Sequence, residues 1–223
     1  MQYTIVQLFR TALMIFGALF PIVNPLENIP IFLTLTYGFP SDIRAVLARK
    51  VAVNGFVLLV VATLVGTHIL AFFGISLAVV QVGGGCVVIA TGWNLLRKDE
   101  DDSHPVAPKS LKPSFLSQRA FYPLTLPLTV GPGSISVAIA VGANRPNGSQ
   151  LGWYLPIAVV GGCAAIAISI YLSYRFAESI GRVLGETAMN VIIRLSSFIL
   201  VCIGVQIFWN GASTLLHSVL APK

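Results

Sequence analysis

The sequence predicts an all-α, polytopic membrane protein with six transmembrane helices, arranged as two inverted three-helix repeats whose first helices are broken. The first observation is composition: the 223 residues are 56% hydrophobic and 10% charged, whereas soluble domains contain about 25% charged residues. So few charged side chains cannot cover a water-facing surface, which excludes a soluble enzyme or binding module. The other two observations are apolar runs of crossing length and a proline pattern that occurs twice.

Apolar runs without charge define the crossings. A bilayer-crossing helix needs about 20 mostly apolar residues, and residues 51–96 contain no Asp, Glu, Lys or Arg. The first apolar segment would be about 51 Å long as one helix, against a hydrocarbon core of about 30 Å. It carries proline in its middle, as does the fourth segment, so both are expected to be interrupted. The six expected crossings are Thr4–Tyr37, Val51–Phe73, Ile75–Leu96, Phe115–Asn144, Trp153–Tyr174 and Ile192–Leu216.

Basic residues are distributed unevenly among the expected loops. The formal net charge is +6, and the loops after the first, third and fifth crossings carry most of the Lys and Arg. The positive-inside rule places these loops in the cytoplasm and both termini outside. The bilayer therefore accounts for the basic balance, and no nucleic-acid partner is expected. The basic residues concerned are Arg44, Arg49, Lys50, Arg97, Lys98, Lys109, Lys112, Arg119, Arg175 and Arg182.

The chain divides into two similar halves. Residues 1–97 are expected to form the first three-helix repeat, residues 98–114 a cytoplasmic linker, and residues 115–223 the second repeat. Segments 20–30 and 122–132 align with three prolines in register, at an offset of 102 residues. Because three crossings is an odd number, the second copy must enter the membrane from the opposite side. This is the inverted-repeat plan found in many transporters.

The paired proline segments are also the best candidates for a binding site. Proline removes an N–H donor and disfavours helical backbone in the residue before it. Irregular backbone survives inside a membrane only where it is buried in protein or lines a wet cavity. Each segment could be a simple kink, an unwound crossing or a re-entrant hairpin. The expected helix-breaking residues are Pro21, Pro30, Pro123 and Pro127.

The ends of the broken helices have the polarity needed to bind a zwitterion. The helix N-terminus expected at 131–134 offers free N–H groups to a carboxylate, and carbonyls at opposite half-helix ends suit an ammonium group or a small cation. Glu27 is the only acidic residue clearly within a crossing, so it is a candidate for a coupling proton or a substrate ammonium. The alternatives are a helix-capping charge for Glu27 and interhelical hydrogen bonding for the neutral residues. The candidate substrate-binding residues are Asn24, Pro25, Glu27, Asn28, Thr125, Thr129, Gly131, Pro132, Gly133 and Ser134.

Metals, cofactors and catalytic motifs are not expected. Cys86, Cys163 and Cys202 lie in apolar runs without metal-ligand spacing. The glycine runs 83–85 and 161–162 lack a phosphate-binding motif and instead indicate close helix packing. No motif of a serine hydrolase or a zinc protease is present, so the chain is not expected to be an enzyme.

The chain resembles the MarC family of bacterial inner-membrane proteins, also called the neutral amino acid transporter family. The resemblance rests on segments 20–32 and 123–135, and extends to Phe73-Gly74-Ile75-Ser76 and the Gly83–Gly85 run. It implies six crossings, a plasma-membrane location and, for some members, export of small neutral amino acids. Glu27 stands where many relatives carry glycine, so the resemblance assigns it no family-wide coupling role.

These observations lead to one functional expectation. The chain is expected to be a secondary transporter of small neutral amino acids, an exporter of the alanine or glycine type, in the bacterial plasma membrane. The first alternative is a channel or another efflux protein for small solutes or drugs. The second is a non-transporting membrane enzyme or assembly factor. The expected partners are the small-molecule substrate and the lipid bilayer, and a homo-oligomer is compatible with the sequence.

Overall fold

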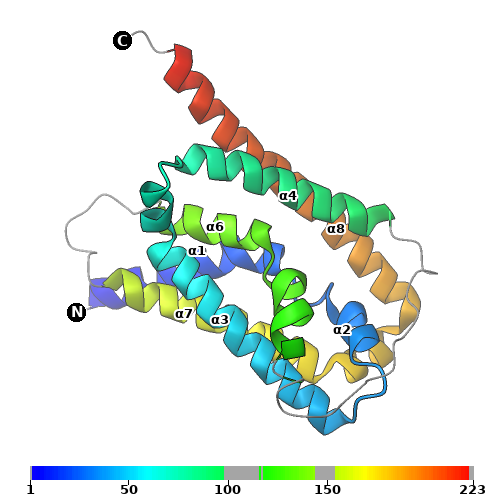
Figure 1. Cartoon of the computed structure of the whole chain (residues 1–223). Coiled ribbons are helices and arrows are strands. Elements are labelled where there is room, and N and C mark those ends of the chain that lie inside the picture. Colours follow the sequence, from blue (N-terminus) through cyan, green and yellow to red (C-terminus); the bar gives the residue numbers. More distant parts are fainter. Residues whose placement is uncertain (1, 98–115, 117, 144–153, 221–223) are drawn as a thin grey trace.

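The computed structural model describes residues 2–97, 116, 118–143 and 154–220, and its secondary structure there is helical without strands (Figure 1). The all-α prediction is confirmed. The expected linker 98–114 lies outside the described residues. The helices are α1 (Gln2–Val23), α2 (Ile29–Leu35), α3 (Ser41–Phe72), α4 (Leu77–Arg97), η1 (Ala120–Thr129), α6 (Pro132–Ala143), α7 (Tyr154–Arg175) and α8 (Ala177–Leu220).

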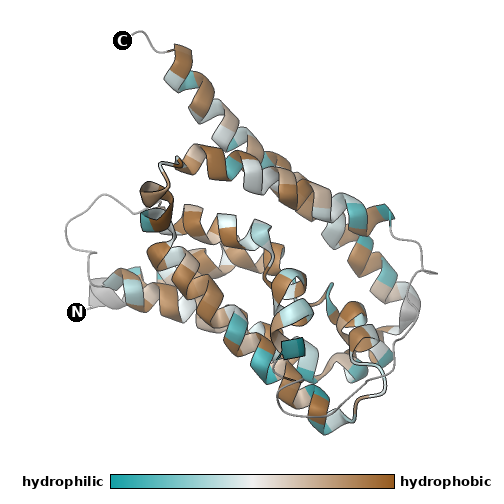
Figure 2. Cartoon of the chain, viewed as in Figure 1, coloured by the Kyte–Doolittle hydropathy of each residue, from teal (hydrophilic) through white to brown (hydrophobic). Residues whose placement is uncertain are grey.

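The expected membrane character is present in the described helices. Five of them contain spans long and apolar enough to cross a bilayer, and the pair η1 and α6, bent by 67°, would make a sixth. Figure 2 shows hydrophobic residues along these helices, with hydrophilic residues toward the beginning of α3, the end of α4 and the beginning of α8. The prediction of a polytopic membrane protein is therefore confirmed, with five to six candidate crossings where six were predicted.

Two helices extend beyond the boundaries that hydropathy predicts. Helix α3 begins at Ser41, directly after Pro40, so Arg44, Arg49 and Lys50 lie on a helical extension and not in a loop. Helix α8 begins at Ala177 and bends at Gly185, where φ is +69°. Hydropathy misses both extensions because a helix continues past the hydrocarbon core wherever its backbone hydrogen bonds can form.

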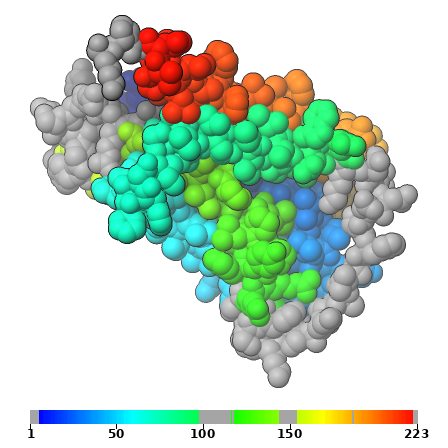
Figure 3. All heavy atoms as spheres, turned by 45° about the horizontal axis from the view of Figure 1, so that its top comes forward, coloured from blue at the N-terminus to red at the C-terminus, as the bar shows by residue number. Residues whose placement is uncertain are grey.

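Helices α4 and α8 form an antiparallel pair that packs closely at glycine residues. A Cβ built on Gly85 would lie 2.5 Å from the amide nitrogen of Phe208, and one on Gly92 would lie 2.9 Å from the carbonyl oxygen of Ser197. Along the seam, a later position in α4 thus meets an earlier one in α8. Figures 1 and 3 show α4 lying along α8, with α6 beneath α4. Small residues allow this close approach without a hydrophobic driving force between helices.

The remaining helices enclose the broken segments. Helix α3 packs against α6, α7 and η1, and α1 packs against α7 and α6. Close backbone contacts recur here: a Cβ on Gly142 would lie 1.9 Å from the carbonyl oxygen of Thr63, and one on Gly162 would lie 2.8 Å from that of Ala12. The expected close packing is thus present at Gly84, Gly85 and Gly162, whereas Gly83 meets nothing within 4 Å.

Candidate functional site

The first interruption is a turn at residues 24–28, between α1 and α2. Pro21 lies inside α1 and does not end it, contrary to its expected role, because the helix stops two residues later at Val23. Asn24 adopts a φ of +36°, a region that asparagine tolerates better than most residues. Pro25 is buried within the turn, and Pro30 is the second residue of α2. The break therefore comes from the turn at Asn24 and not from Pro21 or Pro30.

The Asn28 side chain closes the C-terminal end of α1. Its amide nitrogen donates to the carbonyl oxygens of Val23 at 3.1 Å and Asn24 at 3.2 Å. These are carbonyls of the kind expected to be free for a substrate ammonium. In this structure they are occupied, because a helix end buried away from water must find donors for its last carbonyls.

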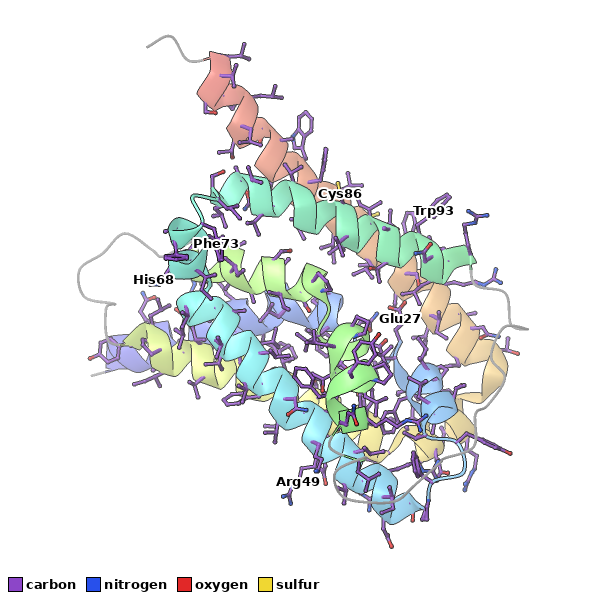
Figure 4. The ribbon with its side chains drawn as sticks, in the orientation of Figure 1. Glu27, Arg49, His68, Phe73, Cys86 and Trp93 are labelled. Atoms are coloured by element: carbon purple, nitrogen blue, oxygen red, sulfur yellow. The ribbon has the colours of Figure 1, made fainter. Side chains whose placement is uncertain are left out.

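Glu27 lies in the same turn and is only 3% exposed. Its carboxylate accepts a hydrogen bond from the amide of Asn24, and the hydroxyl oxygen of Ser197 in α8 lies 2.7 Å from its Oε1. Within the described part of the chain it forms no ion pair. Figure 4 shows Glu27 in the middle of the assembly, whereas His68, near the end of α3, is exposed.

The second interruption is the bend between η1 and α6. Tyr122 and Leu126, the residues before Pro123 and Pro127, depart from helical dihedral angles, as the steric effect of proline on the preceding residue requires. The backbone thus departs from regular helix directly before both prolines, and η1 has the wide, π-type form. The chain then turns at Val130 and Gly131, and α6 begins at Pro132.

Most of the polar groups at this bend are buried and bonded to nearby backbone. The hydroxyls of Thr125 and Thr129 donate to the carbonyl oxygens of Ala120 and Leu124, both at 2.7 Å. Ser134 donates to the carbonyl oxygen of Gly131 at 2.9 Å. Gly133 and Ser134 are buried at the start of α6, whereas Pro127 and Pro132 are exposed. The first N–H groups of a helix have no acceptor within it, so this end carries the donors expected for a carboxylate.

Tyr174 of α7 joins the two interrupted segments. Its ring stacks on that of Phe32 in α2, with centroids 4.4 Å apart and planes 11° from parallel. Its hydroxyl lies 2.8 Å from the hydroxyl of Thr129 in η1. One fully buried side chain thus contacts both α2, which follows the first interruption, and η1, which precedes the second.

The residues that complete the site were not predicted from the sequence. Tyr174 stands at the end of an apolar run beside Arg175, where an aromatic side chain normally indicates the membrane interface. Ser197 is one of five serines in the long helix α8. Asn54 of α3 donates to Thr125 at 3.4 Å. A polar residue inside an apolar run was the available sign in each case, but it does not identify the partner.

A cavity of about 840 Å³ adjoins the first interruption. It starts at Ile29 and Pro30, next to the turn, and extends between α2, the beginning of α3 and the beginning of α8. Arg44 of α3 and Glu178 of α8 form an ion pair in its wall. A second cavity of about 360 Å³ lies at the start of η1 and is lined by Arg119, Tyr122 and Pro123 among others. The larger cavity is within the usual range for small-molecule sites, about 300–1,000 Å³.

Among the described residues, no group of three His, Cys, Asp or Glu side chains is placed to hold a metal ion. Cys86 and Cys202 are exposed, and Cys163 is buried. The polar groups of the two interrupted segments can therefore bind a ligand through hydrogen bonds and through the carboxylate of Glu27.

The fold defines an integral membrane protein in which apolar helices surround two interrupted segments. The family model described as MarC family integral membrane protein matches residues 9–216. The chain belongs to this family.

Individual relatives match over nearly their whole length. The membrane protein YvbG of Bacillus subtilis is 32% identical over 198 residues, 88% of this chain and 92% of the relative. The inner membrane protein MarC of Citrobacter koseri is 30% identical over 205 residues, 90% of this chain and 93% of the relative. These descriptions name membrane proteins and no enzymatic activity. No solved structure matches the chain.

Proposed function

We propose that this protein is a secondary transporter of small neutral amino acids, an exporter of the alanine or glycine type. The observation that carries the proposal is the meeting of two interrupted helices at Tyr174, inside a membrane protein. Interrupted helices buried near the middle of a bilayer are the usual substrate sites of secondary transporters. The cavity beside Ile29 and Pro30 supports the proposal because it leads from one end of the helices toward the first interruption.

The proposed site receives the two charged ends of an amino acid in different places. The buried start of α6, at Gly133 and Ser134, is suited to the carboxylate because free N–H groups and the positive end of the helix dipole act together. The remaining candidate residues of the turn at 24–28 and of η1 supply acceptors and shape for the ammonium end. A neutral side chain fits because the described surroundings of these segments are largely apolar.

The helix contacts support an inverted repeat, with α1 corresponding to η1, α2 to α6, α3 to α7 and α4 to α8. Helix α1 packs on α7, and correspondingly η1 packs on α3. Helix α3 packs on α6, and α7 on α2; α4 packs on α6, and α8 on α2. The pairs α3–α7 and α4–α8 each join corresponding helices. This is the pattern that a twofold relation between residues 1–97 and 115–223 would produce.

We also infer that the cavity opens toward the cytoplasm and that both termini lie outside. The beginning of α3, the end of α4 and the beginning of α8 lie toward one end of the assembly (Figures 1 and 2). The described basic residues Arg44, Arg97, Arg175 and Arg182 belong to that end, as the positive-inside rule requires for the cytoplasmic face.

Alanine flux in proteoliposomes tests the transport function. We expect saturable uptake of labelled alanine and stimulation by unlabelled alanine on the opposite side. Gly133→Ala is expected to reduce the flux by about tenfold or more, because a charged hydrogen bond lost to the added methyl group is worth about 1.5–3 kcal/mol. Gly83→Ala is the matched control, since a Cβ there meets nothing within 4 Å. Flux that never saturates and shows no exchange would favour the channel instead.

The Gly133 variant needs a second substitution, because its Cβ would lie 2.4 Å from Cγ2 of Val88. In the double variant Gly133→Ala with Val88→Ala, the room for the methyl group is restored. We expect this variant to regain thermal stability without regaining flux. Recovery of flux in the double variant would mean that Gly133 serves helix packing alone, and the proposed carboxylate site would then be wrong.

Thiol labelling tests the direction of the cavity. In a variant with the three native cysteines replaced by serine, Leu33→Cys is expected to react with a membrane-impermeant maleimide in inside-out vesicles and not in intact spheroplasts. Leu33 lines the cavity, and a thiol must reach water to ionise and react. Val57→Cys, on an exposed apolar face of α3, is the control and is expected to remain unlabelled from both sides. Labelling of Leu33→Cys in spheroplasts would reverse the inferred orientation.

A further inference from the structure

The hydroxyl group of Ser197 lies between two acceptors. Its oxygen is 2.7 Å from the carbonyl oxygen of Ile193, one turn earlier in α8, and 2.7 Å from Oε1 of Glu27. A serine hydroxyl carries one hydrogen and two lone pairs. It can therefore donate to only one of these oxygens at a time, and the other contact must be satisfied in a different way.

Two protonation states of Glu27 satisfy this arrangement. When Glu27 is ionised, Ser197 donates to Oε1 and Asn24 donates to Oε2. When Oε1 carries a proton, that proton is donated to Ser197, and Ser197 donates to the carbonyl oxygen of Ile193. Because Asn24 serves as a donor to the carboxyl group in both states, neither state leaves a buried polar group without a partner. Gain or loss of one proton changes only the direction of the Ser197 hydroxyl.

Among the residues that the structure describes, the charged and titratable groups around Glu27 offer it no countercharge. Helix α7 brings Tyr174, whose hydroxyl is bonded to Thr129, and α6 contains no titratable side chain. Helix α8 brings Arg194, which is exposed, and further back Glu178 and Arg182 at the cavity wall, where Glu178 pairs with Arg44. A buried carboxylate without a cation is costly, so uptake of a proton relieves that cost, and loss of the proton needs a route to water.

The structure places a cavity close to Glu27 along the chain and connects Glu27 mechanically to α8. The cavity of about 840 Å³ begins at Ile29 and Pro30, two and three residues from Glu27. On the other side, Ser197 belongs to the seam between α4 and α8, where Gly92 lies against its carbonyl oxygen. Glu27 thus lies near an access cavity and is hydrogen-bonded to Ser197 of α8, the helix against which α1 and α2 pack.

We propose that Glu27 is the proton-binding residue that couples transport to proton movement, and that Ser197 is the positioning residue through which its protonation reaches α8. The coupling rests on the proposed transport function, whereas proton binding at Glu27 does not. In the step itself, a proton from water adds to Oε1 of the carboxylate to give the neutral acid, and the reverse step returns it.

Difference infrared spectroscopy of the whole protein in lipid tests proton binding directly. We expect a carboxylic C=O band that titrates with pH in the wild type and is lost in Glu27→Gln, which keeps the size of the side chain and can still hydrogen-bond to Ser197. Ser197→Ala is expected to shift that band, whereas Ser196→Ala, on the neighbouring residue, leaves it in place. If the band persists in Glu27→Gln, or if no carboxyl band titrates in the wild type, proton binding at Glu27 is overturned.

Alanine flux with and without an imposed pH gradient tests the coupling. We expect the gradient to stimulate flux in the wild type and in Ser196→Ala, and that stimulation to be lost in Glu27→Gln and weakened in Ser197→Ala. Stimulation that survives in Glu27→Gln would refute coupling through this residue. An absence of any alanine flux in the wild type would instead count against the proposed transport function, and the infrared titration would still decide whether Glu27 binds the proton.

Discussion

Tyr174→Ala is expected to lower the free energy of unfolding by about 3–5 kcal/mol, the usual cost of removing a buried aromatic ring. The side chain is 2% exposed, stacks on Phe32 and is hydrogen-bonded to Thr129. Its loss would leave a cavity between α2, η1 and α7 and would remove a partner of a buried hydroxyl. Thermal unfolding in detergent micelles, followed by circular dichroism, measures the effect as a fall in Tm.

Removing only the hydroxyl of Tyr174 separates the contribution of its hydrogen bond to stability from that of its ring. Tyr174→Phe is expected to cost about 1 kcal/mol, the typical net contribution of one hydrogen bond. Tyr171→Phe, one turn earlier in the same helix, is the control, because the structure gives its hydroxyl no hydrogen bond within the described residues. A Tm for Tyr174→Ala equal to that of the wild type would mean that the two interrupted segments do not meet at this ring.

Gly85→Ala is expected to destabilise the fold by about 1–3 kcal/mol through overpacking. The added Cβ would lie 2.5 Å from the amide nitrogen of Phe208 and 2.8 Å from the carbonyl oxygen of Gly204. Both are backbone atoms, so the strain cannot be relieved by a rotamer change, and α4 must move away from α8. A lower Tm and earlier aggregation on size-exclusion chromatography would report this separation.

The matched control for Gly85 stands two residues earlier on the same helix. Gly83→Ala adds the same methyl group where nothing lies within 4 Å. Because alanine favours helix over glycine by about 1 kcal/mol, this variant is expected to be as stable as the wild type or slightly more so. Equal Tm values for the two variants would contradict the close contact of α4 with α8.

The sequence could predict the helices but not all of their ends. Crossings such as 51–73 and 75–96 follow from the hydrocarbon core, which demands about 20 apolar residues. The beginning of α3 at Ser41 and the part of α8 before Gly185 lie outside that requirement. Pro21 was assigned to a break because proline disrupts helix interiors, yet it lies in the last turn of α1. Proline there leaves the carbonyl oxygen of Gly17 without its helical donor, but only two residues of α1 follow it, so the helix is hardly shortened.

The candidate site was also predicted in part. The repeat of prolines located both interruptions, and the structure places Glu27, Thr125, Thr129, Gly133 and Ser134 in buried positions there. The closure of α1 by Asn28 was not foreseen. It depends on the sharp turn at Asn24, which folds a side chain back onto carbonyls five and four residues earlier.

The sequence by itself determined the membrane environment, the approximate crossings and the two places where the backbone departs from helix. These follow from local properties: the length of apolar runs and the geometry of proline. Only the tertiary structure decided that Tyr174 lies against both α2 and η1 and that Ser197 faces Glu27. Those contacts join residues 142 and 170 positions apart in the chain. They depend on how glycines such as Gly85 and Gly142 let the helices approach, and helix packing of that kind leaves no periodic pattern in the sequence.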